Sequence, residues 1–443
     1  MSSTSSSSSS PVVADVVELD DLAEPTFSAG TRETLAMIAS VVDQCPLDSE
    51  AIHRQAAADL GLDDFGPRDY LERLDLLLGG YRDLPGLTPT GQVNLFFQMV
   101  QLLKNRLLLT DLLRRHPEIP DVELIPPLVI AGLPRSGTTH LQHLLAATGR
   151  FRVLPYWESL EPFTIPVERG VLPDPRWQRC DQSMTVMHAC VPRLVLMHEI
   201  DTPDHIHEEI ALLANDFSTM YFETMGDIPA WREYYRAHDQ EPHYAYLRLQ
   251  LQAVQYEEGQ HLEGQHQGAG RRWLLKSPQH LEQLTVLDRV FPGATIVITH
   301  RDPVHIATSM ATMIAYADRM FRHPVDPHRV GAVWAERLGL MLDDLVRDRD
   351  LLTQTAATDL RFDDFLADQI GAVEKIMALA GEKFTDDARA GVAGYLESHT
   401  RGHLGRVAYR PEQVGHDPAE LRERFAPYAE RFLAGSGNDK ENA

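Results

Sequence analysis

Short apolar runs alternate along this 443-residue chain with longer stretches in which apolar residues recur at helical spacing. A short apolar run bounded by turn residues is typical of a buried strand. The predicted strands are Leu128–Ala131, Phe151–Leu154, Trp273–Lys276, Ala294–Thr299 and Ala357–Phe362. Strands that alternate with helical patterns favour an α/β fold with a central parallel sheet flanked by helices.

The same pattern suggests how the chain is divided. Residues 1–30 begin with a serine tract and become acidic, which predicts a disordered tail, and residues 435–443 predict a second one. Residues 31–125 predict a helical N-terminal cap, and residues 126–434 predict the α/β domain, with a helical insertion around 176–258. Residues 258–270 are polar and glycine-rich, so we interpret them as an exposed excursion whose two histidines, His261 and His266, bind no metal.

The segment 127–145, PLVIAGLPRSGTTHLQHLL, places a glycine-containing turn between a predicted strand and a predicted helix. Such a turn aims several backbone N–H groups at one point, and the helix dipole adds partial positive charge there. Gly132 and Gly137 have the glycine spacing of a P-loop, but Thr138 stands where that loop has its lysine. Arg135 supplies a cation inside the turn instead. The pattern predicts a P-loop-type, three-layer fold and an anion site unlike that of an ordinary ATPase.

This turn resembles the 5′-phosphosulfate loop of sulfotransferases that use 3′-phosphoadenosine 5′-phosphosulfate (PAPS). It is most similar to the form with arginine in the loop, as in tyrosylprotein sulfotransferases and many bacterial members. The resemblance implies that PAPS is the co-substrate and leaves as adenosine 3′,5′-bisphosphate (PAP). The loop residues that it implies for donor binding are Pro134, Arg135, Ser136, Gly137, Thr138 and Thr139.

A second motif, WLLKSPQHLEQLTVLDRVFPGATIVITHRDPVHIATS at 273–309, strengthens the resemblance. Arg301 and Ser309 lie eight residues apart, as in the sulfotransferase element that holds the 3′-phosphate. A guanidinium fork matches phosphate oxygens and a hydroxyl adds one more donor. Asp302 and Pro303 predict the start of a helix directly after the strand.

The composition restricts the choice of partners and surroundings. A formal net charge of −24 opposes binding to nucleic acid or to anionic membranes. Three cysteines without metal spacing indicate reduced thiols. Neither a secretory signal nor a run of roughly 20 apolar residues is visible, so we expect a cytoplasmic location without a membrane span. A homo-oligomer is compatible with the sequence, which does not define the oligomeric state.

Three residues are the candidates for catalysis. Arg135 would stabilise charge on the departing phosphate, and Lys276, at the end of its strand, resembles the lysine near the bridging oxygen in sulfotransferases. Glu158 follows the second strand, 23 residues after Arg135, and resembles the glutamate base of tyrosylprotein and some bacterial sulfotransferases. A structural ion pair or a helix cap is the alternative role for Glu158.

Other groups compete with these candidates or add to them. The rival bases are His280 and the group His198, His205, His207, Glu208 and Glu209; His140 and His143 are interpreted as packing residues. The Arg/Gly-rich segment 401–409 resembles the mobile basic segment that closes over PAPS, which makes Arg406 and Tyr409 candidate donor contacts.

We therefore predict a sulfotransferase that moves a sulfuryl group from PAPS to a hydroxyl or amine of a small-molecule, lipid or carbohydrate acceptor. The transfer is base-assisted and in line, with positioning and charge stabilisation as its main devices and no metal. Two alternatives remain: a P-loop nucleotide kinase, with Asp302 as its metal-binding carboxylate, and a catalytically silent nucleotide-binding scaffold of the same fold.

Overall fold

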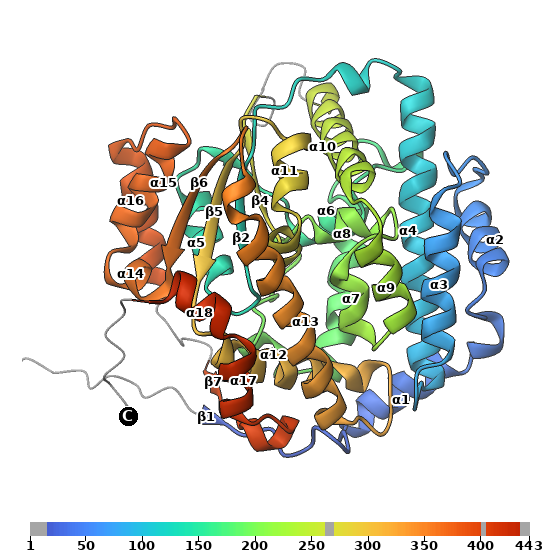
Figure 1. Ribbon diagram of the computed structural model, residues 1–443. Helices are drawn as coiled ribbons and strands as arrows, with labels where there is room; N and C mark the ends of the chain where they lie inside the picture. The colour runs from blue at the N-terminus through green and yellow to red at the C-terminus, as the bar shows by residue number, and fades with distance from the viewer. Residues whose placement is uncertain (1–15, 262–269, 400–404, 435–443) are drawn as a thin grey trace, which may run out of the picture.

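A parallel five-stranded sheet lies between layers of helices in the computed structural model, which describes residues 16–261, 270–399 and 405–434 (Figure 1). Its strands stand in the order β3-β4-β2-β5-β6. They are β2 (Leu128–Gly132), β3 (Phe151–Arg152), β4 (Arg272–Lys276), β5 (Thr295–His300) and β6 (Ala356–Arg361). All five predicted strands are present within a few residues of their predicted ends. The predicted fold class, a P-loop-type α/β fold with helices on both faces of a parallel sheet, is confirmed.

The alternation of side chains along the central strand explains why both faces are covered. Leu128 and Ile130 of β2 pack into one hydrophobic cluster, whereas Val129 and Ala131 pack into another on the opposite face. Successive residues of a strand point to opposite faces, so a continuous apolar run needs helices on both sides.

One face of the sheet is covered by helices from the loop side and from the C-terminal third of the chain. These are α5 (Thr138–Ala147), α14 (Phe362–Ala367), α15 (Gln369–Leu379) and α16 (Asp386–Ser398). The other face packs on helices that include α10 (Glu241–His261), α11 (Leu284–Val290), α12 (Pro303–Ala317) and α13 (Pro327–Asp348). The short α17 (Pro418–Arg424) and α18 (Ala426–Phe432) lie against α12 and α13.

The N-terminal helices form a layer beside the insertion. They are α1 (Ala29–Ala39), α2 (Ser49–Leu60), α3 (Tyr70–Arg82) and α4 (Pro89–Arg115). The insertion contributes α7 (Pro175–Cys190), α8 (Ile210–Ala214) and α9 (Pro229–Ala237), and α6 (Tyr156–Leu160) precedes it. Leu74, Leu103, Phe217 and Trp231 share one buried cluster. Because the N-terminal helices and residues 214–235 bury their apolar faces against each other, the predicted cap shares its core with the insertion.

The structure differs from the sequence prediction for the end of the N-terminal tail. Residues 1–15 and 435–443 lie outside the described residues, but β1 (Val16–Val17) pairs in parallel with β7 (Arg406–Val407). Leu19 and Leu22 are buried, and Asp21 forms an ion pair with Arg319 at 2.9 Å. Two buried leucines among acidic residues are enough to hold this stretch against the core, a contact that composition does not reveal.

The polar stretch predicted as an exposed excursion also differs in part. Helix α10 continues to His261, and Glu258 within it forms an ion pair with Arg152 of β3. Residues 262–269, which include His266, lie outside the described residues.

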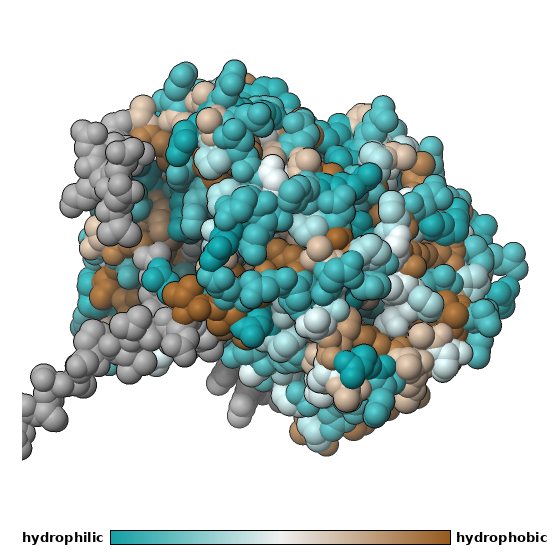
Figure 2. Space-filling view, turned by 90° about the horizontal axis from the view of Figure 1, so that it is seen from below, coloured by the Kyte–Doolittle hydropathy of each residue, from teal (hydrophilic) through white to brown (hydrophobic). Residues whose placement is uncertain are grey.

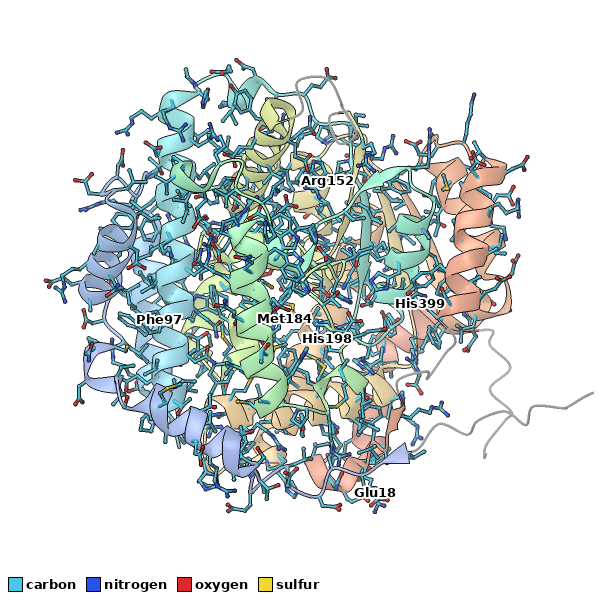
Figure 3. The ribbon with its side chains drawn as sticks, turned by 180° about the vertical axis from the view of Figure 1, so that it is seen from behind. Glu18, Phe97, Arg152, Met184, His198 and His399 are labelled. Atoms are coloured by element: carbon cyan, nitrogen blue, oxygen red, sulfur yellow. The ribbon has the colours of Figure 1, made fainter. Side chains whose placement is uncertain are left out.

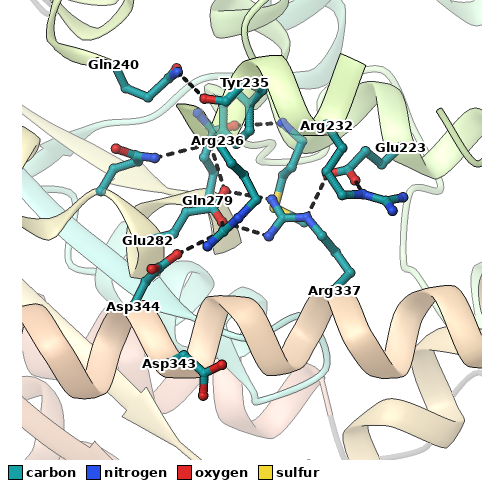
Figure 4. Close-up of polar contacts among 12 residues, drawn as sticks. Glu223, Arg232, Tyr235, Arg236, Gln240, Gln279, Glu282, Arg337, Asp343 and Asp344 are labelled. Carbon is teal, nitrogen blue, oxygen red and sulfur yellow. Dashed lines mark hydrogen bonds and ion pairs between the residues drawn. The ribbon is translucent and has the colours of Figure 1, made fainter. Parts of the chain in front are cut away.

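A buried network of charges joins the helix layers at the second motif (Figure 4). Arg337 of α13 donates to both oxygens of Glu282 at 2.7 Å and to Glu223 at 2.6 Å. Glu282 ends the 3₁₀ helix η6 (Pro278–Glu282), which follows Lys276 directly. Tyr235 adds a hydrogen bond to Glu282 at 2.7 Å. Arg232 also pairs with Glu223 and Arg236 with Glu282, so three guanidinium groups offset the two buried carboxylates and fix the segment after Lys276 to the neighbouring helices.

We predict that Arg337→Met strongly destabilises the fold. Removing the fully buried member of this network leaves Glu223 and Glu282 with one arginine partner each and an excess of buried negative charge, and breaking a buried pair costs about 3–5 kcal/mol. The control is Arg54→Met, whose exposed ion pair with Glu50 is worth under about 1 kcal/mol. Urea denaturation of the two variants measures the difference, and equal free energies of unfolding would contradict the role of Arg337.

Candidate functional site

The turn between β2 and α5 has the backbone of an anion-binding loop. Arg135 has a φ of 68° and Gly137 a φ of 90°. A non-glycine residue in the left-handed region costs about 1–3 kcal/mol, and such strain concentrates at functional sites. A Cβ at Gly137 would also lie 2.8 Å from the Phe362 ring, so glycine is required there for space as well as for conformation. The helix α5 begins directly after this turn. Its N-cap residue is Gly137, so no N-cap side chain accepts from the first backbone N–H groups of the helix.

Buried hydroxyls hold the turn in place. The Ser136 hydroxyl donates to the Leu133 carbonyl at 2.6 Å and lies 2.8 Å from the Thr299 hydroxyl. Ser136 is 1 % exposed and so lies behind the loop surface. These bonds tie the loop after β2 to the neighbouring strand β5.

The Arg135 guanidinium contacts three neutral groups. It donates to the Ser309 hydroxyl at 3.1 Å, to the Tyr409 hydroxyl at 3.2 Å and to the Met197 carbonyl. None of these three acceptors carries a charge. The positive charge of Arg135 is therefore available to an anion that enters the site.

The second motif meets the first at this point. Arg301 follows β5 and donates to the backbone carbonyl of Arg135 at 2.7 Å, while its guanidinium lies 4.1 Å from the Phe362 ring centre. Asp302 caps α12 by accepting from the Val304 N–H at 3.0 Å, as its sequence predicted. The cap directs α12 so that Ser309 reaches Arg135. The structure thus brings Arg135, Arg301 and Ser309 together from positions up to 174 residues apart.

Two adjacent glutamates hold Lys276 at the end of β4. The ammonium group pairs with Glu208 and lies 3.4 Å from the Thr139 hydroxyl of the loop. The backbone N–H of Lys276 donates to Glu209 at 2.9 Å. Glu209 also pairs with His280. Burial alone would raise the pKa of the Glu209 carboxyl, but the contacts with His280 and with the Lys276 N–H outweigh burial and lower this pKa below its usual value. Lys276 is thus fixed beside the loop by its side chain and by its backbone.

A cavity of about 1660 Å³ extends from this loop into the helical insertion. The predicted donor residues on its wall are Pro134, Arg135, Gly137, Thr138, Thr139, Arg301, Ser309, Arg406 and Tyr409. Ser136 and Lys276 are buried directly behind this wall. Residues 401–404 of the predicted basic segment lie outside the described residues.

The structure does not bring Glu158 to this wall. Helix α6 presents Tyr156, Trp157 and Ser159 to the cavity, whereas Glu158 accepts from Arg152 at 2.6 Å. Burial raises the pKa of the Glu158 carboxyl above its ordinary value, although Arg152 opposes the shift. Arg152 lies well above His198 in Figure 3. Glu158 therefore occupies the structural ion pair that was the alternative to its predicted role as base.

Buried histidines surround Lys276 on the cavity side. Burial, and then the positive charge of Lys276, lowers the pKa of His198 to about 3 and that of His205 to about 4. Burial lowers the pKa of His143 to about 3, and its Nδ1 lies 2.8 Å from the Tyr395 hydroxyl. Burial also lowers the pKa of His207 well below its usual value. These imidazoles are neutral at pH 7, and those of His143, His198 and His207 form an uncharged lining next to the cations.

Sequence reasoning missed two parts of the site. Phe362 contributes an aromatic ring next to Gly137 and Arg301, and the Met197 carbonyl binds Arg135. Phe362 directly follows β6, so the rule that sites lie at the carboxyl ends of parallel strands could have found it. A backbone carbonyl such as that of Met197 carries no sequence signal.

The described residues lack two further kinds of site. Within the described ranges no group of three or more His, Cys, Asp or Glu side chains has the arrangement of a metal site. In the same part of the chain no helix combines the length and apolarity that crossing a membrane requires. Figure 2 shows one face of the molecule as mostly hydrophilic, with separate hydrophobic patches.

Comparisons with known proteins agree with this geometry. Residues 126–386, more than half of the chain, match the model of the Sulfotransferase family, and the chain therefore belongs to that family. Sulfotransferase STF1 from Mycobacterium tuberculosis H37Rv is similar at 27 % identity and a TM-score of 0.72, covering 86 % of this chain and 99 % of STF1. Sulfotransferase STF9 from Mycobacterium avium has the same fold at 23 % identity and a TM-score of 0.74, covering 87 % of this chain and 96 % of STF9. No curated protein sequence matches the chain significantly. The predicted membership of a bacterial-type sulfotransferase family is confirmed.

We predict that stability falls as the pH decreases from about 6.5 towards 4. The unfolded histidines take up protons near pH 6.5, whereas His143, His198 and His205 stay neutral in the fold until about pH 3–4. The unfolded state therefore binds more protons in this window, and each such histidine lowers the free energy of unfolding by up to about 1.4 kcal/mol per pH unit.

Urea denaturation between pH 7.5 and 4.5 measures this slope. The variant His143→Gln should have a smaller slope than the wild type, and the exposed His328→Gln should not change it. A wild-type stability that is flat between pH 6.5 and 4.5 would contradict the prediction.

Proposed function

We propose that this chain transfers the sulfuryl group of PAPS to a hydroxyl of an acceptor that binds in the same cavity. One observation carries the proposal: Arg301 hydrogen-bonds to the backbone of Arg135, and Arg135 hydrogen-bonds to Ser309. The two motifs that resemble the 5′- and 3′-phosphate elements of sulfotransferases thus contribute to one wall of one cavity. When bound, PAPS supplies the sulfuryl group and a phosphate leaving group.

The donor set of this wall suits a nucleotide with phosphates at both ends. The N–H groups of residues 136–139 and the helix dipole of α5 would hold the 5′-phosphosulfate. Arg301 and Ser309 would hold the 3′-phosphate through charge-assisted hydrogen bonds. The Phe362 ring offers an aromatic surface for the adenine, next to Gly137.

The segment after residue 404 would complete the donor site. Arg406 and Tyr409 both line the cavity, and Tyr409 already contacts Arg135. The pairing of β7 with β1 holds these residues over the loop. Arg406 would add a third cation to the phosphate-binding wall.

Lys276 and Arg135 would stabilise the charge that develops on the departing phosphate. Lys276 is fixed in advance beside Thr139, and Arg135 is fixed by its strained backbone. Cations that are positioned before the reaction need no reorganisation in the transition state, which makes their contribution large.

Glu208 is our candidate for the base that accepts the acceptor proton. It lines the cavity and pairs with Lys276, whereas Glu158 pairs with Arg152 outside that lining. A Lys276 ammonium drawn towards the transferring group would release the Glu208 carboxylate for the acceptor hydroxyl. His198, which is neutral and lines the same cavity, is the second candidate.

The family bears on the two alternative functions, the nucleotide kinase and the silent scaffold. Membership of the Sulfotransferase family argues against a nucleotide kinase. A catalytically silent scaffold of the same family would bind PAP without consuming PAPS. Detection of PAP after incubation with PAPS and an acceptor distinguishes an active sulfotransferase from a silent scaffold.

We predict that Arg301→Ala weakens PAP binding roughly 10- to 100-fold, because a hydrogen bond to a charged group contributes about 1.5–3 kcal/mol. Titration calorimetry with PAP and with 5′-AMP tests the assignment, since 5′-AMP lacks the 3′-phosphate and should lose little affinity. Arg410→Ala, which breaks an exposed ion pair with Glu18 in the same segment as Arg406, is the control. Equal losses for PAP and 5′-AMP would contradict the role given to Arg301.

We predict that Glu208→Gln lowers kcat about 10²- to 10⁴-fold, the usual contribution of a general base, while PAP binds with near wild-type affinity. Glu158→Gln should change kcat little, because its carboxylate lies outside the cavity wall. The measurement is PAP release from PAPS in the presence of an active acceptor. A large loss of kcat in Glu158→Gln together with a near-normal Glu208→Gln would return the base to Glu158.

A further inference from the structure

The cavity is larger than the donor requires. Pockets for a single drug-sized ligand measure about 300–1,000 Å³, whereas this cavity measures about 1660 Å³. The phosphate-binding wall occupies one end of it. The remaining space extends beneath α7 and towards α1 and α4, and we call this part the distal arm. Figure 3 shows the direction: Phe97 on α4, His198 and His399 follow one another across the molecule.

The walls of the distal arm are mainly apolar. Helices from three layers contribute to them: representative residues are Ile38, Val93, Phe97, Val186, Met187 and Met313. Several lining residues are methionines, whose unbranched, polarisable side chains adapt to the shape of a flexible apolar ligand. Such walls favour hydrocarbon over hydrated groups.

The helices of these walls contribute little charge, and Glu161 and Glu199 line the cavity from the connecting segments. Among the described residues of α4, α7 and α12 that line the cavity, Arg179 is the one formally charged side chain. It is already paired with Glu161 and with Glu168, both at 2.7 Å. A charged acceptor would lose its hydration along these helices and find no unpaired opposite charge on them, which costs free energy. The acceptor body is therefore neutral.

The polar side chains that α4 adds to the arm, which include Thr90, already form hydrogen bonds within the protein, Thr90 to the Leu35 carbonyl at 3.0 Å. On α4, the Gln98 amide donates to Asn94 and the Gln101 amide donates to Asn105, both at 2.9 Å. A free sugar would bring many hydroxyls against methionine and leucine side chains and leave them without partners. A molecule with a single polar end avoids this cost.

The arm is also long. Helix α4 lines the cavity from Thr90 to Leu102, which is ~18 Å of helix at ~1.5 Å per residue. Phe97, on this stretch, is 49 % exposed, so the wall reaches the molecular surface there. The opposite end of the cavity holds Glu208, His198 and the phosphate-binding loop. A polar group at one end and an apolar wall over this length fit an elongated molecule.

We propose that the acceptor is a neutral long-chain alcohol of lipid type, with its hydroxyl at Glu208 and its chain in the distal arm. The proposal rests on the sulfotransferase function proposed above and narrows the acceptor to one class. The alcohol oxygen forms the new bond to sulfur, and the bond from sulfur to the phosphate oxygen breaks with its electron pair on the phosphate. The hydroxyl proton passes to Glu208. The products are the alkyl sulfate and PAP.

The test is a series of unbranched primary alcohols from C4 to C14, compared with glucose, using the full chain and PAPS. PAP release gives kcat/KM for each alcohol. We expect kcat/KM to rise about fourfold for each added methylene, the gain expected from burying one CH₂ group. A rate that is independent of chain length, or higher with glucose than with every alcohol, would overturn the proposal.

A blocked arm provides the matched variant. Val186→Trp fills the arm from α7, and Thr185→Trp places the same ring on the exposed side of that helix. Val186→Trp should lower kcat/KM for the C12 alcohol at least 30-fold and leave the C4 alcohol within threefold, while Thr185→Trp behaves as the wild type. Ala317→Phe, which lines the cavity from α12, is a second blocking variant should Val186→Trp fail to fold. Equal losses for short and long alcohols in a folded blocking variant would contradict an arm that holds the chain.

Failure of this proposal can be separated from failure of the proposed function. A protein that binds PAP and sulfates glucose but no alcohol keeps the function and overturns the acceptor class. A protein that neither binds PAP nor consumes PAPS with any acceptor overturns both.

Discussion

The parallel pairing of β2 with β5 is the constraint on which the site depends. Gly132 at the end of β2 lies opposite Thr299 of β5, so the chain leaves both strands at the same edge of the sheet. A Cβ at Gly132 would lie 1.9 Å from the Thr299 hydroxyl, which shows how closely the two strand ends approach. Because of this register, the turn that carries Arg135 and the turn that carries Arg301 contact each other. An antiparallel pair, or a shift by a few residues, would separate the two guanidinium groups.

The two cations of the site, Arg135 and Lys276, have partners of different charge. Arg135 contacts neutral acceptors, and Lys276 contacts the carboxylate of Glu208. The first arrangement keeps a positive charge ready for a phosphate, and the second holds a cation and a carboxylate together until a new anion arrives. The buried network around Arg337 supports this arrangement from behind, because Glu282 ends the same segment that begins with Lys276. Stability and function are thus linked through the few residues between Lys276 and Glu282.

Glu158 illustrates why sequence spacing does not assign a base. Its position 23 residues after Arg135 and just beyond a strand resembles that of a glutamate base, but the structure places it in an ion pair with Arg152. The direction of its side chain depends on Arg152, which lies on β3 and carries a charge that must be neutralised when it is buried. Glu208 lies on a segment without regular pattern; its side chain lines the cavity and pairs with the Lys276 ammonium, whereas the neighbouring Glu209 accepts from the Lys276 backbone N–H.

The sequence by itself determined the strands, the loop and the family. A run of apolar residues followed by glycine and a helical pattern has few stable conformations, so local physics is enough to predict a strand, a turn and a helix N-terminus. The tertiary structure decided which side chains meet. The contact of Arg135 with Tyr409, the placement of Phe362 beside Gly137 and the distal arm beneath α7 join residues hundreds of positions apart. No local pattern encodes these contacts, because they depend on how the layers pack and on which charges must find partners once water is excluded.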